Sequence, residues 1–157
     1  MSEFDIYSGK VRVRSCGLIK RNEELLLVKQ SVPTKNHPVW ILPGGGVQFA
    51  EESEKALIRE VYEETGLNIS PHRLRYVHEF IQGTFHSIEL YYICDILSGT
   101  IKTGSDPEHD KNQQLIIDVA WHSLNRISQI ELFPEFLRDD AQKGSLFDDV
   151  ISYFKTA

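Results

Sequence analysis

The sequence predicts a layered fold of the α/β or α+β class, with helices packed on a mixed β-sheet. Segments with the alternation of strands stand on both sides of a charged amphipathic helix, and further apolar segments follow towards the C-terminus. The 157 residues have the usual length of one domain, and 41% hydrophobic and 25% charged residues are ordinary for a globular protein. No linker separates these segments, so we expect one domain over residues 1–157.

The N-terminal part is expected to be β-structure. Residues 11–19 and 24–30 alternate as strands do, and the polar turn between them predicts a hairpin. A short strand at 39–42 then leads into the turn Pro43-Gly44-Gly45-Gly46, which precedes the charged segment.

The charged segment is expected to be a helix that ends at Gly66 and has Ser53 as its N-cap. Leu57, Ile58 and Val61 form the apolar stripe that should fix this helix on the sheet. The remaining expected elements are strands at 73–82 and 86–97, a polar loop at 104–114, a strand at 115–121, a short helix at 124–130, a helix from Pro134 to about residue 142 and a closing helix at 146–154.

The same helix carries clustered carboxylates. At 100° per residue, Glu60, Glu63 and Glu64 fall within an arc of about 100°, so these side chains repel one another. Such a cluster is tolerated on a fully solvated helix, or where a multivalent cation neutralises it, and oxygen ligands favour magnesium, manganese or calcium over zinc. The glycine turn, together with Glu51 placed to pair with Arg59, weighs against a merely solvated helix.

Residues 45–67 read GGVQFAEESEKALIREVYEETGL and have the complete spacing of a family signature. The signature positions are Gly45, Glu51, Arg59, Glu60, Val61, Glu63, Glu64, Gly66 and Leu67. This pattern, G-x5-E-x7-R-E-U-x-E-E-x-G-U with U a bulky aliphatic residue, resembles that of the Nudix hydrolases. The resemblance implies a Nudix α/β/α sandwich with a mixed sheet and a loop-helix-loop catalytic motif.

The resemblance also implies an activity. Nudix hydrolases use water to cleave the pyrophosphate bond of a nucleoside diphosphate linked to a moiety X, with Mg²⁺ or Mn²⁺ as cofactor; ADP-ribose, nucleoside triphosphates and nucleotide sugars are the expected classes. By position, the implied metal ligands are Glu60, Glu63, Glu64 and the Gly44 carbonyl. Arg59 and Glu51 match the pair that supports them. The alternative is a non-catalytic nucleotide-binding or regulatory module with the same fold.

The base that deprotonates the attacking water is less closely defined. Family members take it from the signature or from a later loop, and this chain has Lys111 where similar members often carry an acidic residue. Glu63, Glu108 and Asp110 therefore compete for the role, with Glu108 as our choice within the loop.

Candidate substrate contacts lie outside the acidic helix. Arg12 and Arg14 alternate on the first strand and can face a phosphate, although an exposed strand edge explains them equally well. Gly45 and Phe49 are the other candidate substrate-binding residues. Further rings able to stack on a base, or to pack in the core, are Phe80, Tyr92 and Phe133.

Net charge and cysteine usage indicate which binding partners and which cellular compartment to expect. A net charge of −6 argues against general binding to nucleic acid or to anionic membranes, so we expect a small-molecule nucleotide substrate, with a homodimer as a candidate assembly. Cys16 and Cys94 lack CxxC spacing and are expected to be buried free thiols. Because no apolar signal core or membrane-length apolar run occurs, a cytoplasmic location is expected.

Overall fold

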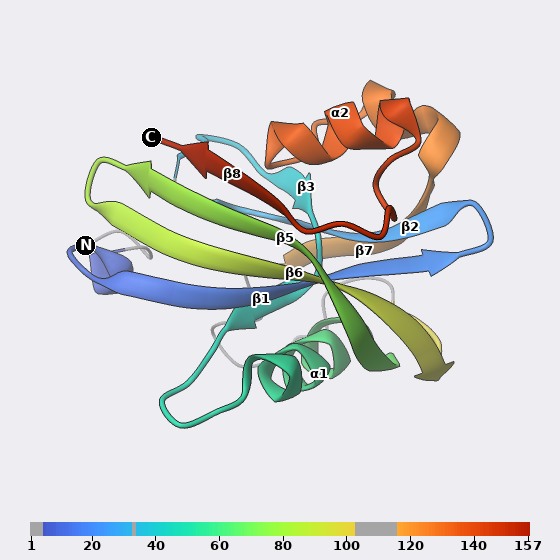
Figure 1. Cartoon of the computed structure of the whole chain (residues 1–157), viewed down its shortest axis with the longest axis horizontal. Coiled ribbons are helices and arrows are strands. Elements are labelled where there is room, and N and C mark those ends of the chain that lie inside the picture. The colour runs from blue at the N-terminus through green and yellow to red at the C-terminus, as the bar shows by residue number, and fades with distance from the viewer. Residues whose placement is uncertain (1–4, 33, 103–115) are drawn as a thin grey trace.

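The computed structural model describes residues 5–32, 34–102 and 116–157, and it has a mixed β-sheet with helices on two sides (Figure 1). The described elements, in chain order, are η1 (Asp5–Tyr7), β1 (Val11–Arg21), β2 (Glu24–Gln30), β3 (Val39–Ile41), β4 (Gly44–Gly46), α1 (Ser53–Thr65), β5 (Asn68–Gln82), β6 (Phe85–Ser98), β7 (Ile116–Ser123), η3 (Leu124–Gln129), α2 (Glu135–Lys143) and β8 (Ser152–Thr156).

The strands are joined in the order β3-β2-β1-β6-β5-β8, with β4 paired to β1 and β7 to β2. The predicted hairpin of β1 and β2 is confirmed, but these strands pair only where Lys20 faces Leu25 and Arg21 faces Glu24. Beyond this short contact β1 pairs in parallel with β6, while β2 pairs with β3 and β7. The sheet therefore has two parts, β1 with its partners and β2 with its partners, which are joined by the short pairing next to the β1–β2 turn.

Both faces of the sheet are covered, and each has its own apolar core. Leu57 and Val61 of α1 are fully buried in one core, and Leu137 of α2 is fully buried in the other. Strand β6 serves both cores, because Tyr92 packs towards α1 and Tyr91 packs on the opposite face. This arrangement confirms the predicted mixed sheet of the α+β class.

The glycine turn differs from the expectation, because Gly44–Gly46 form a short strand that is antiparallel to β1. Gly44 has a φ of 155°, and a Cβ atom there would lie 2.0 Å from the carbonyl oxygen of Ser15. Only glycine fits so close to β1. The turn is thereby held as an extra strand of the sheet next to α1.

The closing helix predicted at 146–154 is wrong. The buried guanidinium of Arg75 donates to the carbonyl oxygens of Ser145, Leu146 and Val150 at 2.8 to 3.2 Å. A helix would use the same carbonyl groups for its own backbone bonds. The chain instead turns through this segment and then pairs in parallel with β5 as strand β8.

Smaller differences concern element ends. Glu52 occupies the N-cap of α1 without a side-chain capping bond, whereas the Ser53 hydroxyl lies 2.8 Å from the Tyr92 hydroxyl. Ile58 is 38% exposed, so the apolar stripe is narrower than predicted. Strand β5 begins at residue 68 rather than 73, with register shifts around Pro71, and the short helix after β7 is a 3-10 helix.

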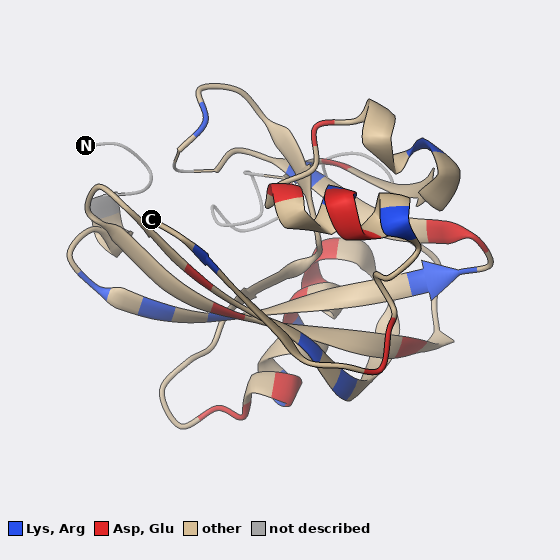
Figure 2. Cartoon of the chain, turned by 45° about the horizontal axis from the view of Figure 1, so that its top comes forward, with Lys and Arg blue, Asp and Glu red and all other residues tan. Residues whose placement is uncertain are grey.

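Both cysteines are buried with free thiols, as predicted. Among the helices that the structure describes, none is long and apolar enough to cross a bilayer. The loop predicted at 104–114 lies outside the described residues. Acidic residues occur on α1 and α2, whereas several basic residues are spaced along β1 (Figure 2).

Candidate active site

Glu64 joins helix α1 to the glycine strand. Its Oε2 accepts a hydrogen bond from the Gly44 N–H at 3.0 Å, in a position that is only partly open to solvent. Desolvation, followed by the nearby charge of Glu60, raises the pKa of Glu64 well above its ordinary value. Desolvation also raises the pKa of Glu60, although Arg59 opposes this. Burial therefore disfavours the charged form of both carboxylates.

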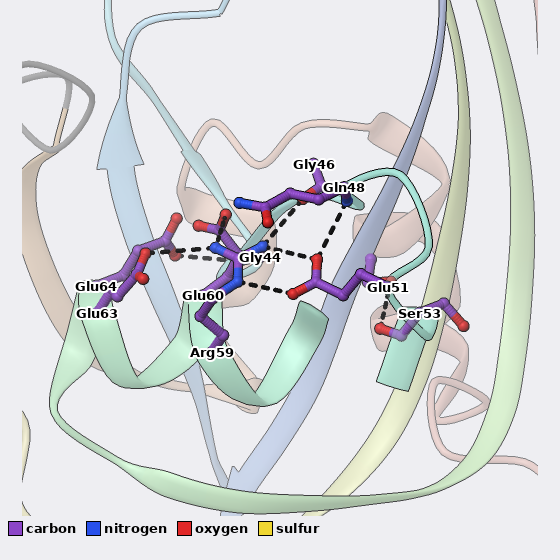
Figure 3. A network of polar contacts seen from close by, with 10 residues as sticks. Gly44, Gly46, Gln48, Glu51, Ser53, Arg59, Glu60, Glu63 and Glu64 are labelled. Atoms are coloured by element: carbon purple, nitrogen blue, oxygen red, sulfur yellow. Dashed lines mark hydrogen bonds and ion pairs between the residues drawn. The ribbon is translucent and has the colours of Figure 1, made fainter. Parts of the chain in front are cut away.

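Arg59 organises the other end of the carboxylate cluster (Figure 3). Its Nε and NH2 groups donate to the two carboxylate oxygens of Glu51, both at 2.9 Å, so the pair predicted from sequence is present and bidentate. Glu51 also accepts the Gln48 N–H at 3.1 Å. The bonds from Arg59 and Gln48 lower the pKa of Glu51 to about 2. The loop that precedes α1 is thus fastened to the helix.

The same guanidinium contacts the signature glutamates. Its NH1 lies 2.8 Å from Oε1 of Glu60 and 3.6 Å from Oε2 of Glu63, and its NH2 donates to the Gly46 carbonyl at 3.3 Å. Arg59 therefore connects the helix, the preceding loop and strand β4.

The carboxylates of Glu60, Glu63 and Glu64 lie on one side of α1, as the helical spacing predicts (Figure 3). Within residues 5–32, 34–102 and 116–157, no three His, Cys, Asp or Glu side chains are gathered closely enough to hold a metal ion as they stand. The donor chemistry nevertheless fits a hard divalent cation. All the donors are oxygen atoms, and two of the three carboxylates have raised pKa values that a cation would lower.

A pocket that is partly open to solvent lies beside strand β1, which pairs with the glycine strand β4. Its walls combine the aromatic residues Phe80, Phe85, Phe133 and Tyr91 with the basic residues Arg12 and Arg14. Strand β1 connects the pocket to the acidic helix, because Arg14 is paired with Gly46 across the β1–β4 ladder.

A buried polar chain, which the sequence analysis missed, supports the wall of this pocket. Arg14 NH1 donates to Oε2 of Glu89 at 2.7 Å, and His78 Nδ1 lies 2.8 Å from Oε1 of the same carboxylate. His78 is fully buried, and its Nε2 lies 2.9 Å from the Thr156 hydroxyl. The sequence signal for this chain was Glu89, a charged residue between apolar residues of a predicted strand. The structure pairs Glu89 with His78 of the neighbouring strand.

Comparison with known proteins agrees with this geometry. The family model for the NUDIX domain matches residues 10–142. The chain belongs to the NUDIX family.

Relatives within the NUDIX family match parts of the chain. The ADP-ribose pyrophosphatase of Methanocaldococcus jannaschii is 35% identical over 95 residues, which are 57% of this chain and 54% of that protein. Diphosphoinositol polyphosphate phosphohydrolase 3-alpha of Mus musculus is 38% identical over 79 residues, or 50% of this chain and 46% of that protein. The chain thus spans about half the length of these curated relatives.

Solved structures share the NUDIX fold with this chain. A MutT protein from Methanosarcina mazei superposes with a TM-score of 0.64 and 24% identity, over 85% of this chain and 91% of that one. A NUDIX hydrolase from Nitrosomonas europaea gives a TM-score of 0.66 and 22% identity, over 87% and 91% of the two chains.

The NUDIX signature residues come together, but the predicted substrate contacts do not all do so. Arg12 and Arg14 line the pocket, as do the candidate rings Phe80 and Phe133. Tyr92 lies in the core under α1. Phe49 is fully exposed on the loop before α1 and is absent from the pocket lining. The candidate bases Glu108 and Asp110 lie outside the described residues.

Proposed function

We propose that this NUDIX protein is a divalent-metal-dependent pyrophosphohydrolase that cleaves a nucleoside diphosphate linked to a moiety X. One observation carries the proposal: three clustered glutamates of α1 face a glycine strand whose neighbour, β1, forms the wall of an aromatic and basic pocket. A pyrophosphate at the glutamates then leaves its nucleoside within reach of the aromatic rings.

Glu60, Glu63, Glu64 and the Gly44 carbonyl are the proposed ligands of Mg²⁺, with Mn²⁺ as the alternative ion. When bound, the cation neutralises phosphate charge and lowers the pKa of a coordinated water. Glu60 and Glu63, which contact Arg59 in this structure, would hold the cation, and the two bonds between Arg59 and Glu51 keep the guanidinium beside them. That pair is proposed to orient the ligands without touching the substrate.

The proton acceptor is proposed to come from Glu63, Glu108 or Asp110. Glu63 has the most exposed carboxylate of the three on α1, at 43% of its side-chain surface, and can reach a water at the mouth of the site. Phosphoryl transfer depends mainly on alignment and charge neutralisation, so the loss of a base slows a reaction that the rest of the site still supports.

ADP-ribose, nucleoside triphosphates and nucleotide sugars are the proposed substrate classes. The relatives named above act on ADP-ribose and on a diphosphoinositol polyphosphate, and these share a pyrophosphate bond rather than a nucleoside. Arg12, Arg14, Gly45 and Phe49 stay as proposed substrate-binding residues, and only the two arginines line the pocket.

A substrate panel tests the activity. ADP-ribose, nucleotide sugars, dinucleoside polyphosphates and nucleoside triphosphates are each incubated with protein and magnesium, and the phosphorylated products are separated and identified. We expect one class to be cleaved at its pyrophosphate bond, and EDTA to abolish the reaction. Tight binding of a nucleotide with no cleavage of any compound would instead favour the non-catalytic module.

A further inference from the structure

Two arginines on the same side of β1 line the pocket, but their surroundings differ. Arg14 is paired inside the protein, with its NH1 2.7 Å from Glu89 Oε2. The Glu89 side chain is 7% exposed, and its other oxygen contacts His78 at 2.8 Å and the Tyr91 hydroxyl at 3.2 Å. The charge and the position of Arg14 are thus both determined by the fold.

Arg12 has no comparable partner among the side chains of residues 5–32, 34–102 and 116–157. Its guanidinium carbon lies 3.6 Å from the centre of the Tyr7 ring, a stacking contact that orients the group without neutralising it. Among the side chains that the structure describes, no carboxylate forms an ion pair or hydrogen bond with Arg12. Desolvation, followed by the adjacent charge of Arg14, lowers the pKa of Arg12, although the nearby charges of Glu89 and Glu60 oppose this.

Arg12 also lies at the boundary between the pocket and the acidic helix. A Cβ atom on Gly46 would be 3.4 Å from Arg12 NH2, and the carbonyl of Gly46 accepts a bond from Arg59. On its other side the guanidinium faces the pocket that Phe80 and Phe133 also line. An anionic group held by Arg12 would therefore be linked to an apolar ring on one side and lie near the signature glutamates on the other.

We propose that Arg12 is a specificity-determining residue that binds a phosphate group of a nucleotide whose base occupies the aromatic pocket. Glu89 is the positioning residue that holds the Arg14 guanidinium in the pocket wall, and Arg12 is the pocket arginine that forms no ion pair with a carboxylate among the described side chains. This proposal depends on the proposed function in one respect, namely that the ligand is a nucleotide. It follows that the site distinguishes nucleotides from nucleosides through Arg12 even in the absence of metal.

Titration calorimetry in EDTA tests the proposal on the intact chain. ADP, GDP, CDP and UDP are each titrated into the protein, as are the four corresponding nucleosides. For the diphosphate that binds most tightly, Arg12→Gln should raise the Kd by about 10- to 100-fold, the effect of losing one or two charge-assisted hydrogen bonds. Its nucleoside should bind within about twofold of wild type, because it lacks the phosphates.

Arg126→Gln is the matched control, since it removes one positive charge from an exposed position on η3. It should leave both affinities unchanged, and thermal melts should confirm that both variants are folded. Arg12→Lys, which retains the charge but loses the fork geometry, should recover part of the affinity for the diphosphate. Equal affinity for diphosphate and nucleoside in the wild type, or an unchanged diphosphate Kd in Arg12→Gln, would overturn the assignment.

The result is separable from that of the substrate panel. A protein that binds nucleotides through Arg12 without cleaving any substrate would refute the proposed activity and keep the specificity residue. An active enzyme whose Arg12→Gln variant retains the wild-type KM would refute the role of Arg12 and leave the activity intact.

Discussion

The carboxylate of Glu60 packs against the backbone of Gly45 so closely that a Cβ atom at position 45 would lie 2.4 Å from its carboxyl carbon. A side chain at residue 45 would therefore push the Glu60 carboxylate out of its present position. In this structure the second glycine of the turn is needed to make room for a proposed metal ligand.

Gly45→Ala should displace the Glu60 carboxylate and lower kcat by about 10²-fold, because misplacement by about 1 Å is enough for such a loss. Gly46→Ala is the control, since its Cβ would meet only the end of the flexible Arg12 side chain at 3.4 Å. Steady-state kinetics should show a nearly unchanged kcat for that variant. A Gly45→Ala enzyme with wild-type kcat would show that the close contact is not needed for turnover.

The bidentate pair of Arg59 and Glu51 should matter through the ligands that it orients. Glu51→Gln removes the charge that anchors the guanidinium and should lower kcat by about 10- to 100-fold with little change in KM. Glu52→Gln, one residue away on an exposed side chain, should behave as wild type. If the two substitutions change kcat equally, the ion pair between Arg59 and Glu51 does not orient the metal ligands.

The base can be located by comparing the loop acids. If Glu108 accepts the proton, Glu108→Gln should lower kcat by about 10² to 10⁴-fold with little change in KM. Asp110→Asn controls for the loss of loop charge and should have a mild effect. Similar, small losses in both variants would return the assignment to Glu63 on the helix.

The buried carboxylate of Glu89 should stabilise the fold in a pH-dependent way. Burial raises its pKa, but the hydrogen bond from His78 and the charge of Arg14 outweigh this and hold the pKa below the ordinary value of 4.5. Cys16, Tyr91 and Arg12 also interact electrostatically with this carboxylate. The stabilisation is complete above the unfolded-state pKa and is lost as pH falls through the lower folded-state value.

Glu89→Gln should therefore lower the free energy of unfolding at neutral pH by about 3 kcal/mol, because Arg14 is left buried without its counter-charge. The difference from wild type should shrink as pH falls below about 4.5. Urea unfolding at a series of pH values measures both effects. A difference that stays constant down to pH values near 3 would show that the carboxylate charge does not contribute.

The signature site was predictable because its information is local. The spacing of Glu60, Glu63 and Glu64 places them on one side of any helix, and Arg59 needs only a short loop to reach Glu51. The strands of the sheet were predictable for a similar reason, since alternation is visible within each segment. These predictions depend on residues that are close together in the chain.

The errors came from contacts between distant residues. Residues 146–154 are apolar enough for a helix, but Arg75, about seventy positions earlier, takes the carbonyl groups that a helix needs. The polar wall of the pocket depends likewise on Arg14 meeting Glu89, which the parallel pairing of β1 and β6 brings side by side. Sequence patterns indicate the strands and the hairpin between β1 and β2, but not the pairing of strands that are far apart in the chain.

The most direct test of the metal-dependent centre is the initial rate of pyrophosphate cleavage as a function of magnesium concentration, measured for wild type and Glu64→Gln on the best substrate of the panel. Glu64→Gln keeps the size of the side chain but removes a ligand charge. We expect the wild-type rate to rise with magnesium and saturate, and that of the variant to stay lower by about 10²-fold or more at every concentration while its circular dichroism spectrum is unchanged. A wild-type rate that does not depend on magnesium, or a variant as fast as wild type, would contradict the account.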